Sequence, residues 1–286
     1  MSKHTLTILA LPDLHGIIPQ KVLQDAPQFD IIIMPGDICD DNMQKSGKGV
    51  KKVMKKSLDR GKEILQELSN LNKPIYLVPG NWEPTKYSDG IKRENTNFFE
   101  EMIQEFPLVH NCEYRTVHIN ETKTSKVSII GAGSTSAPEI ISKTQLQTRL
   151  EYENEEEEIK ELRERYLYQK QKFEIVSQEF EKLNQNDFKI FLSHNSPYNT
   201  PLDVIKNPFN PLHNQHYGSV LARTIIEKYQ PQLVISGHIH EGVGICKINN
   251  TICLNTGFGD GIYHLITIDI AQNKVLKIKK YGKNAL

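Results

Sequence analysis

Seven side chains of types that bind divalent cations stand directly after short apolar runs of the chain. They are Asp13, His15, Asp37, Asn81, His194, His238 and His240. The runs span residues 5–11, 29–34, 75–78, 190–192 and 233–235, and all five are too short for helices and rich in Ile, Val and Leu. Such runs are typical of strands buried on both faces. Because ligands of open α/β sheets gather beyond the carboxyl ends of the strands, we predict that the seven side chains meet in one crevice.

The side chains fall into five blocks, one after each apolar run, which in chain order contain Asp13 and His15, Asp37, Asn81, His194, and His238 and His240. The spacing within two of these blocks favours convergence on a common site. Asp13 and His15 are two residues apart at a strand end and therefore point the same way. His238 and His240 flank a single residue, which lets both imidazoles approach one site from the same side. Either pair alone is weak evidence for a metal site, and their value lies in the combination.

Glycines precede two of the oxygen ligands. Gly36 allows a sharp turn that carries the Asp37 carboxylate to the sheet edge, where it could bridge two metals. Gly80 precedes Asn81 in the same manner, and Asn81 offers a neutral amide oxygen.

The seven ligands together predict a centre of two metals. Without a cation, so many desolvated polar groups in one crevice would cost several kcal/mol. Seven ligands with one shared suit two divalent cations about 3.5 to 4 Å apart. The set contains oxygen and nitrogen ligands and no cysteine, which favours Mn, Fe or Zn over a soft metal.

The order of elements predicts an α/β fold. Segments of helical character at 19–26, 49–71 and 91–106 alternate with the early strands, which favours right-handed crossovers and parallel strands. Short alternating runs at 116–119, 126–131, 243–248, 251–255, 263–270 and 274–280 indicate antiparallel additions. We therefore expect a single domain over 1–286, built as a layered sandwich of sheets with helices outside.

An insertion within that domain, residues 142–186, is predicted to be helical. It has almost no Gly or Pro and is dense in Glu, Lys, Arg, Gln and Leu. Apolar residues repeat at spacings of three and four, which predicts a heptad-like seam interrupted at Gln169. The seam consists of Ile159, Leu162, Tyr166, Phe173, Val176, Phe180 and Leu183. It could pack on its own sheet, fold back on residues 145–154, or form a homodimer, and we favour cover from the same chain.

Charge and composition limit the other functions. The 35 basic residues balance the 35 acidic ones, so no global field attracts nucleic acid or a membrane. The chain begins without the features of a signal peptide, and no apolar stretch approaches the roughly 18 residues that span a bilayer. We expect a soluble, cytoplasmic protein without membrane partners. Cys246 and Cys253 could face each other on adjacent strands, and we predict that they are reduced thiols of the core.

In order and content, the five blocks resemble those of the calcineurin-like metallophosphoesterases over residues 5–256. Residues 216–219 also resemble the branch of small bacterial and archaeal phosphoesterases. The resemblance implies a four-layer αββα sandwich of two mixed β-sheets. It further implies hydrolysis of phosphate esters by in-line attack of a metal-bound hydroxide. By this resemblance one metal is held by Asp13, His15 and His240, the other is held by Asn81, His194 and His238, and Asp37 bridges them.

The third block departs from the family pattern. Many active members have a His that protonates the departing oxygen where this chain has Trp82. An indole N–H does not titrate near neutral pH, so Trp82 could pack at the crevice rim or stack on an aromatic part of the substrate. We expect Glu83 and Asp40 to contact the metal ligands and orient them, without binding the metals themselves. Without this acid, the hydrolysis of esters with poor leaving groups should be slower by roughly a hundredfold or more. We therefore expect phosphodiesters to be preferred over monoesters.

Another residue could supply the missing proton. His213 and His216 lie in a loop over residues 208–219, which could cover the metals. We favour His216 as the general acid, because Ser219 nearby begins a predicted helix whose N-terminus could bind phosphate. His213 and Ser219 are accordingly predicted to contact the substrate.

Two other functions remain open from the sequence. Relatives of this fold serve as non-catalytic scaffolds, although here every ligand position is filled. A nuclease is a second alternative, weakened by the neutral net charge, so nucleic acid is not the favoured partner. A small phosphate ester is the expected substrate.

Overall fold

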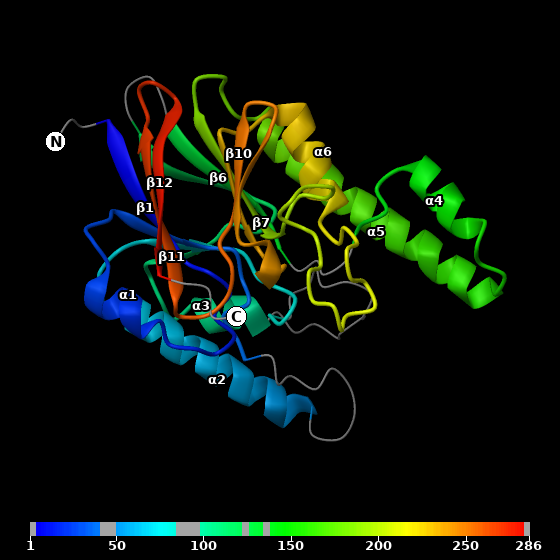
Figure 1. Cartoon of the computed structure of the whole chain (residues 1–286), viewed down its shortest axis with the longest axis horizontal. Helices are drawn as coiled ribbons and strands as arrows, with labels where there is room; N and C mark the ends of the chain where they lie inside the picture. Colours follow the sequence, from blue (N-terminus) through cyan, green and yellow to red (C-terminus); the bar gives the residue numbers. More distant parts are fainter. Residues whose placement is uncertain (1–3, 41–49, 84–97, 122–125, 134–137, 283–286) are drawn as a thin grey trace.

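The computed structural model describes residues 4–40, 50–83, 98–121, 126–133 and 138–282. Within this part of the chain two six-stranded sheets lie face to face, with helices outside them (Figure 1). The first sheet contains, in spatial order, β12 (Lys274–Gly282), β11 (Ile262–Asp269), β1 (Thr5–Ala10), β2 (Ile31–Met34), β3 (Ile75–Leu77) and β4 (Val109–Asn111). The second contains β5 (Thr116–Glu121), β6 (Lys126–Ala132), β7 (Phe188–Asn195), β8 (Leu233–Gly237), β10 (Thr251–Asn255) and β9 (Gly244–Ile248).

Both sheets are mixed, as predicted. The strands β1 to β4 are parallel in the first sheet, and β6, β7, β8 and β10 are parallel in the second. Antiparallel strands β11, β12, β5 and β9 complete the sheets. The five strands that precede the metal-binding blocks are therefore divided between the sheets, three in the first and two in the second.

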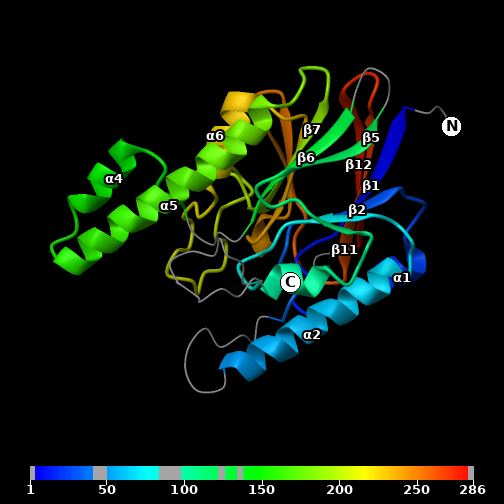
Figure 2. The same ribbon diagram turned by 180° about the vertical axis from the view of Figure 1, so that it is seen from behind.

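Helices cover the outer face of each sheet and explain why the strands are apolar on both sides. The first sheet packs against α1 (Gln20–Asp25), α2 (Val50–Ser69) and α3 (Phe98–Ile103), and the second packs against α5 (Glu156–Glu181) and α6 (Val220–Tyr229) (Figures 1 and 2). Along β1, Ile8 enters the core between the sheets, whereas Leu9 enters the core beneath the helices. This alternation between two buried layers stabilises the rigid strands that carry the site.

The insertion folds into two helices. The first, α4 (Lys143–Leu150), begins at Ser142, whose side chain and that of Gln145 form a reciprocal capping box. The chain turns after α4 and α5 begins in the acidic block, with Glu155 at its N-cap. Figures 1 and 2 show α4 and the first part of α5 extending away from the sheets.

The second half of the α5 seam packs on the protein's own core. Val176 and Phe180 are buried there, and Phe180 stacks on Tyr229 of α6 with ring centroids 5.0 Å apart. Gln169, which interrupts the apolar pattern, is fully buried and its Oε1 accepts a hydrogen bond from Ile140 N at 2.7 Å. Cover by the same chain therefore accounts for this part of the seam, and a homodimer stays a prediction.

Cys246 of β9 lies directly opposite Cys253 of β10 in the antiparallel register, and both are free thiols.

Among the helices that the structure describes, none is both long and apolar enough to cross a bilayer.

Candidate metal centre

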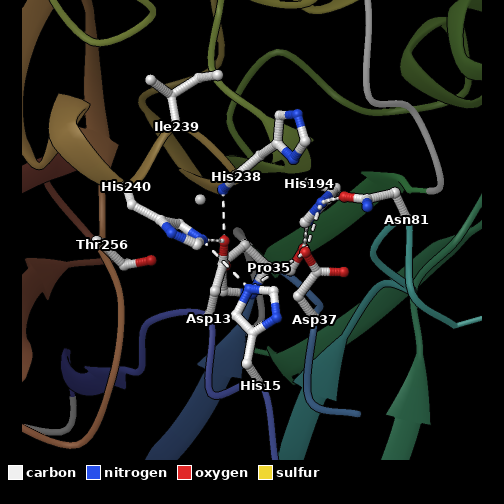
Figure 3. Close-up of polar contacts among 12 residues, drawn as sticks. Asp13, His15, Pro35, Asp37, Asn81, His194, His238, Ile239, His240 and Thr256 are labelled. Carbon is white, nitrogen blue, oxygen red and sulfur yellow. Dashed lines mark hydrogen bonds and ion pairs between the residues drawn. The ribbon is translucent and has the colours of Figure 1, made fainter. Parts of the chain in front are cut away.

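The predicted ligands converge at one end of the two sheets (Figure 3). Asp13, His15 and His240 form one group, here called half-site A, whose ligand atoms all lie within 4.8 Å of one another. Asp37, His194 and His238 form a second group by the same measure, and Asn81 lies against it. We call Asn81, His194 and His238 half-site B, and Asp37 is the carboxylate that it shares with half-site A.

Half-site A combines a buried carboxylate with two imidazoles. The Nε2 atoms of His15 and His240 are 3.2 Å apart, and Nε2 of His240 lies 3.5 Å from Asp13 Oδ2. The same carboxylate oxygen accepts a hydrogen bond from the backbone N–H of His238 at 2.6 Å. The Asp13 side chain is fully buried, but 37% of the His240 side chain is exposed.

Half-site B lies deeper. His194 is completely buried, and its Nε2 lies 2.9 Å from Asn81 Oδ1 and 3.4 Å from Asp37 Oδ2. The other ring nitrogen, Nδ1, lies 3.0 Å from the carbonyl oxygen of Pro35. A proton on Nδ1 donated to this carbonyl leaves the Nε2 lone pair for a cation, which is how metal-binding imidazoles are commonly oriented.

Asp37 lies between the half-sites. Its Oδ2 is 3.6 Å from Nε2 of His15 in half-site A and 3.4 Å from Nε2 of His194 in half-site B. This is the position that a bridging carboxylate requires.

Three of the ligands have a left-handed backbone. The φ angles are 44° at His15, 50° at Asp37 and 63° at His238. Residues other than glycine seldom adopt this conformation, and it concentrates at functional sites, where the surrounding structure maintains the strain. The turns at the strand ends are thus shaped to direct ligands inward.

The glycines of the blocks have two different roles. Gly36 has a φ of 114° and makes the sharp turn that we predicted. At Gly80 the reason is close approach, since a Cβ there would lie 2.0 Å from Asp37 Oδ1. Likewise, a Cβ at Gly237 would lie 2.0 Å from Asp13 Oδ1. Packing between blocks, rather than a turn, therefore requires these two glycines.

The donor set fits divalent cations. The inner atom of the Asn81 amide lies 2.9 Å from His194 Nε2, 3.0 Å from His238 Nδ1 and 3.2 Å from Asp37 Oδ2. An amide nitrogen there has two N–H groups to offer to these acceptors, and an amide oxygen there would be a ligand for a cation held among them. Asp13 Oδ1 is also buried without a hydrogen-bond partner among the described residues. Buried acceptors that face one another are what cations neutralise.

The charges of the ligands are coupled. Burial alone would raise the pKa of Asp37, but the imidazoles of His194, His15 and His238 outweigh burial and hold that pKa well below its ordinary value. Burial would lower the pKa of His194, but the Asp37 carboxylate raises it to about 9. The charge on Asp37 and the proton on His194 therefore stabilise each other.

Glu83 supports the centre through the backbone. It is fully buried, its Oε2 accepts from the N–H groups of Asp37 at 2.8 Å and Gly80 at 2.6 Å, and its Oε1 accepts from Cys39 N at 2.8 Å. Burial and the nearby Asp37 carboxylate raise the pKa of Glu83 to about 7. Glu83 thus joins the second block to the third.

Asp40 is half-buried, and its backbone carbonyl accepts a hydrogen bond from Ser57 Oγ at 2.9 Å.

Trp82 lies beside half-site B. Its backbone N–H donates to Asp37 Oδ1 at 3.1 Å, and its indole Nε1 lies 3.3 Å from the outer amide atom of Asn81. The side chain is half-buried at the edge of the centre, a position compatible with packing and with substrate stacking.

The three loop residues that we predicted to act on the substrate, His216 as general acid and His213 and Ser219 as contacts, differ in their surroundings. His216 Nδ1 lies 2.7 Å from Oδ1 of the buried Asp203, while 35% of the His216 side chain is exposed. His213 is exposed. The phosphate-binding role expected for Ser219 is wrong. Its hydroxyl is buried, donates to Glu139 Oε1 at 2.8 Å and accepts from Ala222 N at 2.9 Å.

Glu139 also occupies the rest of the predicted phosphate site. Its Oε2 accepts from Val220 N at 2.7 Å and Leu221 N at 3.2 Å, so the first amides of α6 already have an anionic partner. A second anion is disfavoured at this helix start.

Phe258 belongs to the centre although we did not predict it from the sequence. Its ring stacks on that of His240, with centroids 4.5 Å apart and planes at 19°, and lies 5.3 Å from the ring of His15. A signal was present, since Gly257 and Gly259 flank Phe258 soon after the apolar run of β10. None of the seven predicted ligands follows β10, so the sequence pattern did not place the end of this strand at the site.

Comparison with known proteins points to one family. The sequence model described as calcineurin-like phosphoesterase matches residues 6–242. The matched range includes all seven ligands and ends before Phe258.

Individual relatives are distant. An uncharacterized protein of Methanocaldococcus jannaschii is 26% identical over 253 residues, which cover 87% of this chain and 87% of that protein. The structure of TT1561 of Thermus thermophilus has a TM-score of 0.56 and 18% identity, with 97% of this chain and 99% of that one covered. A putative 5'-nucleotidase from Staphylococcus aureus has a TM-score of 0.56 and 12% identity, with 97% and 54% covered. At such identities these two structures support the fold alone.

Proposed function

The chain belongs to the calcineurin-like phosphoesterase family, and from this premise we propose that it hydrolyses phosphodiesters in preference to phosphomonoesters, using two divalent cations. The observation that carries the proposal is the convergence of seven ligands in two half-sites with Asp37 between them. We further propose Mn, Fe or Zn as the metal, a small phosphate ester as the substrate, and a cytoplasmic location.

The residues of the centre would act by holding and orienting. Half-site A would hold one cation, Asn81, His194 and His238 would hold the other, and Asp37 would contact both. Such cations, when bound, lower the pKa of water and neutralise charge on the phosphoryl oxygens. The Pro35 carbonyl keeps the proton of His194 on Nδ1, so His194 serves as a ligand rather than as a base.

Trp82 is the basis for the proposed preference for diesters. An indole cannot protonate a leaving alkoxide, so esters with poor leaving groups react slowly unless another acid serves them. The half-buried indole beside half-site B could instead stack on an aromatic group of the substrate.

His216 is our candidate for that acid. The Asp203 carboxylate accepts from His216 Nδ1 at 2.7 Å, which directs Nε2 away from Asp203, and the ring remains partly exposed. The loop that carries His216 is tethered next to half-site A, because Lys206 Nζ donates to the carbonyl of Glu241 at 2.9 Å. A carboxylate that orients a histidine in this way is a recurring arrangement for proton transfer.

The test is hydrolysis by the purified chain, stripped of metal and reloaded with Mn²⁺, of bis(p-nitrophenyl) phosphate and p-nitrophenyl phosphate. We expect turnover of both and a higher kcat/KM for the diester. Faster turnover of the monoester would contradict the preference. Bound metal with no hydrolysis of either would favour the non-catalytic scaffold, and cleavage of DNA or RNA but of neither ester would favour a nuclease.

His216 is tested separately, with His213 as the matched control on the same loop. On a phosphodiester with an alkyl leaving group, whose alkoxide needs a proton to depart, His216→Ala should lower kcat by roughly a hundredfold, the usual range for a general acid, while leaving metal content unchanged. His213→Ala should have little effect, since this side chain is exposed. Equal turnover by wild type and His216→Ala would exclude His216 as the acid.

A further inference from the structure

We propose that Phe258 is a positioning residue that sets the cation affinity of half-site A, although it is not itself a ligand. The inference rests on the two-metal centre of the proposed function and extends it to residues beyond the matched range of the family.

The ring of Phe258 contacts both imidazoles of half-site A. It stacks nearly parallel on His240, at 4.5 Å and 19°, and meets the ring of His15 at 5.3 Å and 60°. The two imidazoles are themselves edge to face, with centroids 5.1 Å apart. Three rings in mutual contact leave His15 and His240 little freedom to rotate, which keeps their Nε2 atoms directed at each other.

The backbone around Phe258 is bound to the third ligand. Asp13 N donates to Gly257 O at 3.1 Å, and Gly259 N donates to Asp13 O at 2.9 Å. These two hydrogen bonds form a parallel bridge between Asp13 and Phe258. Any displacement of Phe258 is therefore transmitted to Asp13 as well as to the two rings.

The residue at the end of β10 fixes the other side of the half-site. Asn255 is fully buried, and its Nδ2 donates to Ile239 O at 2.9 Å and lies 3.3 Å from Gly237 O. Its Oδ1 accepts from Gly257 N at 2.8 Å. One short segment, residues 255–259, thus holds the turn that carries His240 and also places the ring that packs on it.

Half-site B depends on different support. Its buried His194 is oriented by the Pro35 carbonyl, and its backbone turns are joined by Glu83. The rings of His15 and His240 instead share an aromatic neighbour, and His240 is partly exposed. Loss of the Phe258 ring should therefore weaken half-site A selectively.

The experiment is calorimetric titration of metal-free protein with Mn²⁺, in wild type, Phe258→Leu and Phe258→Tyr. We expect two binding events in wild type. Phe258→Leu, which keeps apolar bulk but loses the ring, should weaken one event by about tenfold, the lower range for outer-layer supports of metal ligands. Phe258→Tyr keeps the aromatic ring, so its two Mn²⁺ affinities should match those of wild type.

Two further variants assign the effect. Phe180→Leu removes a comparable ring on α5, which stacks on Tyr229 rather than on a ligand, and should lower thermal stability without changing either affinity. In a His240→Ala background, which disables half-site A, adding Phe258→Leu should leave the remaining event unchanged.

The outcomes separate this inference from the proposed function. A wild-type chain that binds no Mn²⁺ would overturn both. Two unchanged events in Phe258→Leu, or equal weakening of both events, would overturn only the positioning role of Phe258 and leave the two-metal centre in place.

Discussion

Half-sites A and B present similar ligands in different surroundings. In half-site B the His194 side chain is fully excluded from solvent, whereas in half-site A 37% of the His240 side chain is exposed. Half-site B is supported by hydrogen bonds that the Pro35 carbonyl and the Glu83 carboxylate accept, and half-site A is supported by the ring of Phe258. Burial strengthens the electrostatic attraction of a cation that is well coordinated, and it slows exchange with water. Shared ligand chemistry therefore does not make two cation sites equivalent, and we expect half-site B to bind more tightly.

The largest effect should come from the residue that the half-sites share. Asp37→Asn removes the carboxylate whose Oδ2 lies 3.6 Å from His15 Nε2 and 3.4 Å from His194 Nε2. We expect turnover to fall by more than about a hundredfold, beyond the usual cost of losing an outer support. Metal content by elemental analysis should fall below two per chain. Asp30→Asn is the control, because Asp30 lies on the surface, where its Oδ2 accepts a hydrogen bond from Thr7 N at 2.7 Å. Normal turnover in Asp37→Asn would show that the two half-sites are independent.

The next test removes one ligand from each half-site. His240→Ala and His194→Ala should each retain about one metal per chain. They should differ in stability, because loss of His194 leaves the Pro35 carbonyl without its donor, at a cost of about 1–3 kcal/mol, whereas loss of partly exposed His240 leaves Asp13 Oδ2 with the His238 N–H as its donor. Urea unfolding of the metal-free variants measures the difference. Equal destabilisation would contradict the proposed asymmetry.

A smaller effect is expected for the support of half-site B. Glu83→Gln replaces a carboxylate oxygen with an NH₂ group that faces backbone N–H donors, so half-site B should weaken by about tenfold. Glu139→Gln is the matched control, since Glu139 accepts from the N–H groups at the start of α6, away from the ligands. Both variants should lose stability in thermal denaturation, and only Glu83→Gln should change the Mn²⁺ titration. A similar change in both would assign the effect to the fold.

The smallest effect on the centre should come from substitution of His264. This variant tests whether metal is lost in acid because the half-sites are protonated or because the protein unfolds. Burial, with a contribution from Lys280, lowers the pKa of His264 to about 4. Because the unfolded chain binds this proton more readily, stability is complete above the ordinary pKa of about 6.5 and falls as the pH drops toward 4, by about 3 kcal/mol. His264→Leu should flatten the stability profile over this window and leave metal affinity at neutral pH unchanged. A profile as steep as wild type would mean that other groups govern acid unfolding.

Much of the centre was predictable because strand ends can be read locally. The run before Asp13 predicted a strand at 5–11 and the structure has β1 at Thr5–Ala10, so the ligand falls where the sheet ends. Residue types then limited the chemistry to oxygen and nitrogen ligands. The two mixed sheets are confirmed, and so is the family.

The failures share a cause, which is contact between residues far apart in the chain. Ser219 was a reasonable phosphate ligand until Glu139, 80 positions earlier, proved to occupy the helix start. The interruption at Gln169 proved to be a hydrogen bond to the backbone of Ile140. Nothing local in either segment indicates its partner.

By itself, the sequence determined which atoms can bind metal and that they follow buried strands, because residue identity and apolar periodicity are local properties. The tertiary structure alone decided how the ligands are shared, with Asp37 between two half-sites that differ in burial. It also decided the support of each half-site, by Glu83 on one side and Phe258 on the other. Those relations depend on how two sheets pack and on the desolvation that results, and both arise only when distant segments meet.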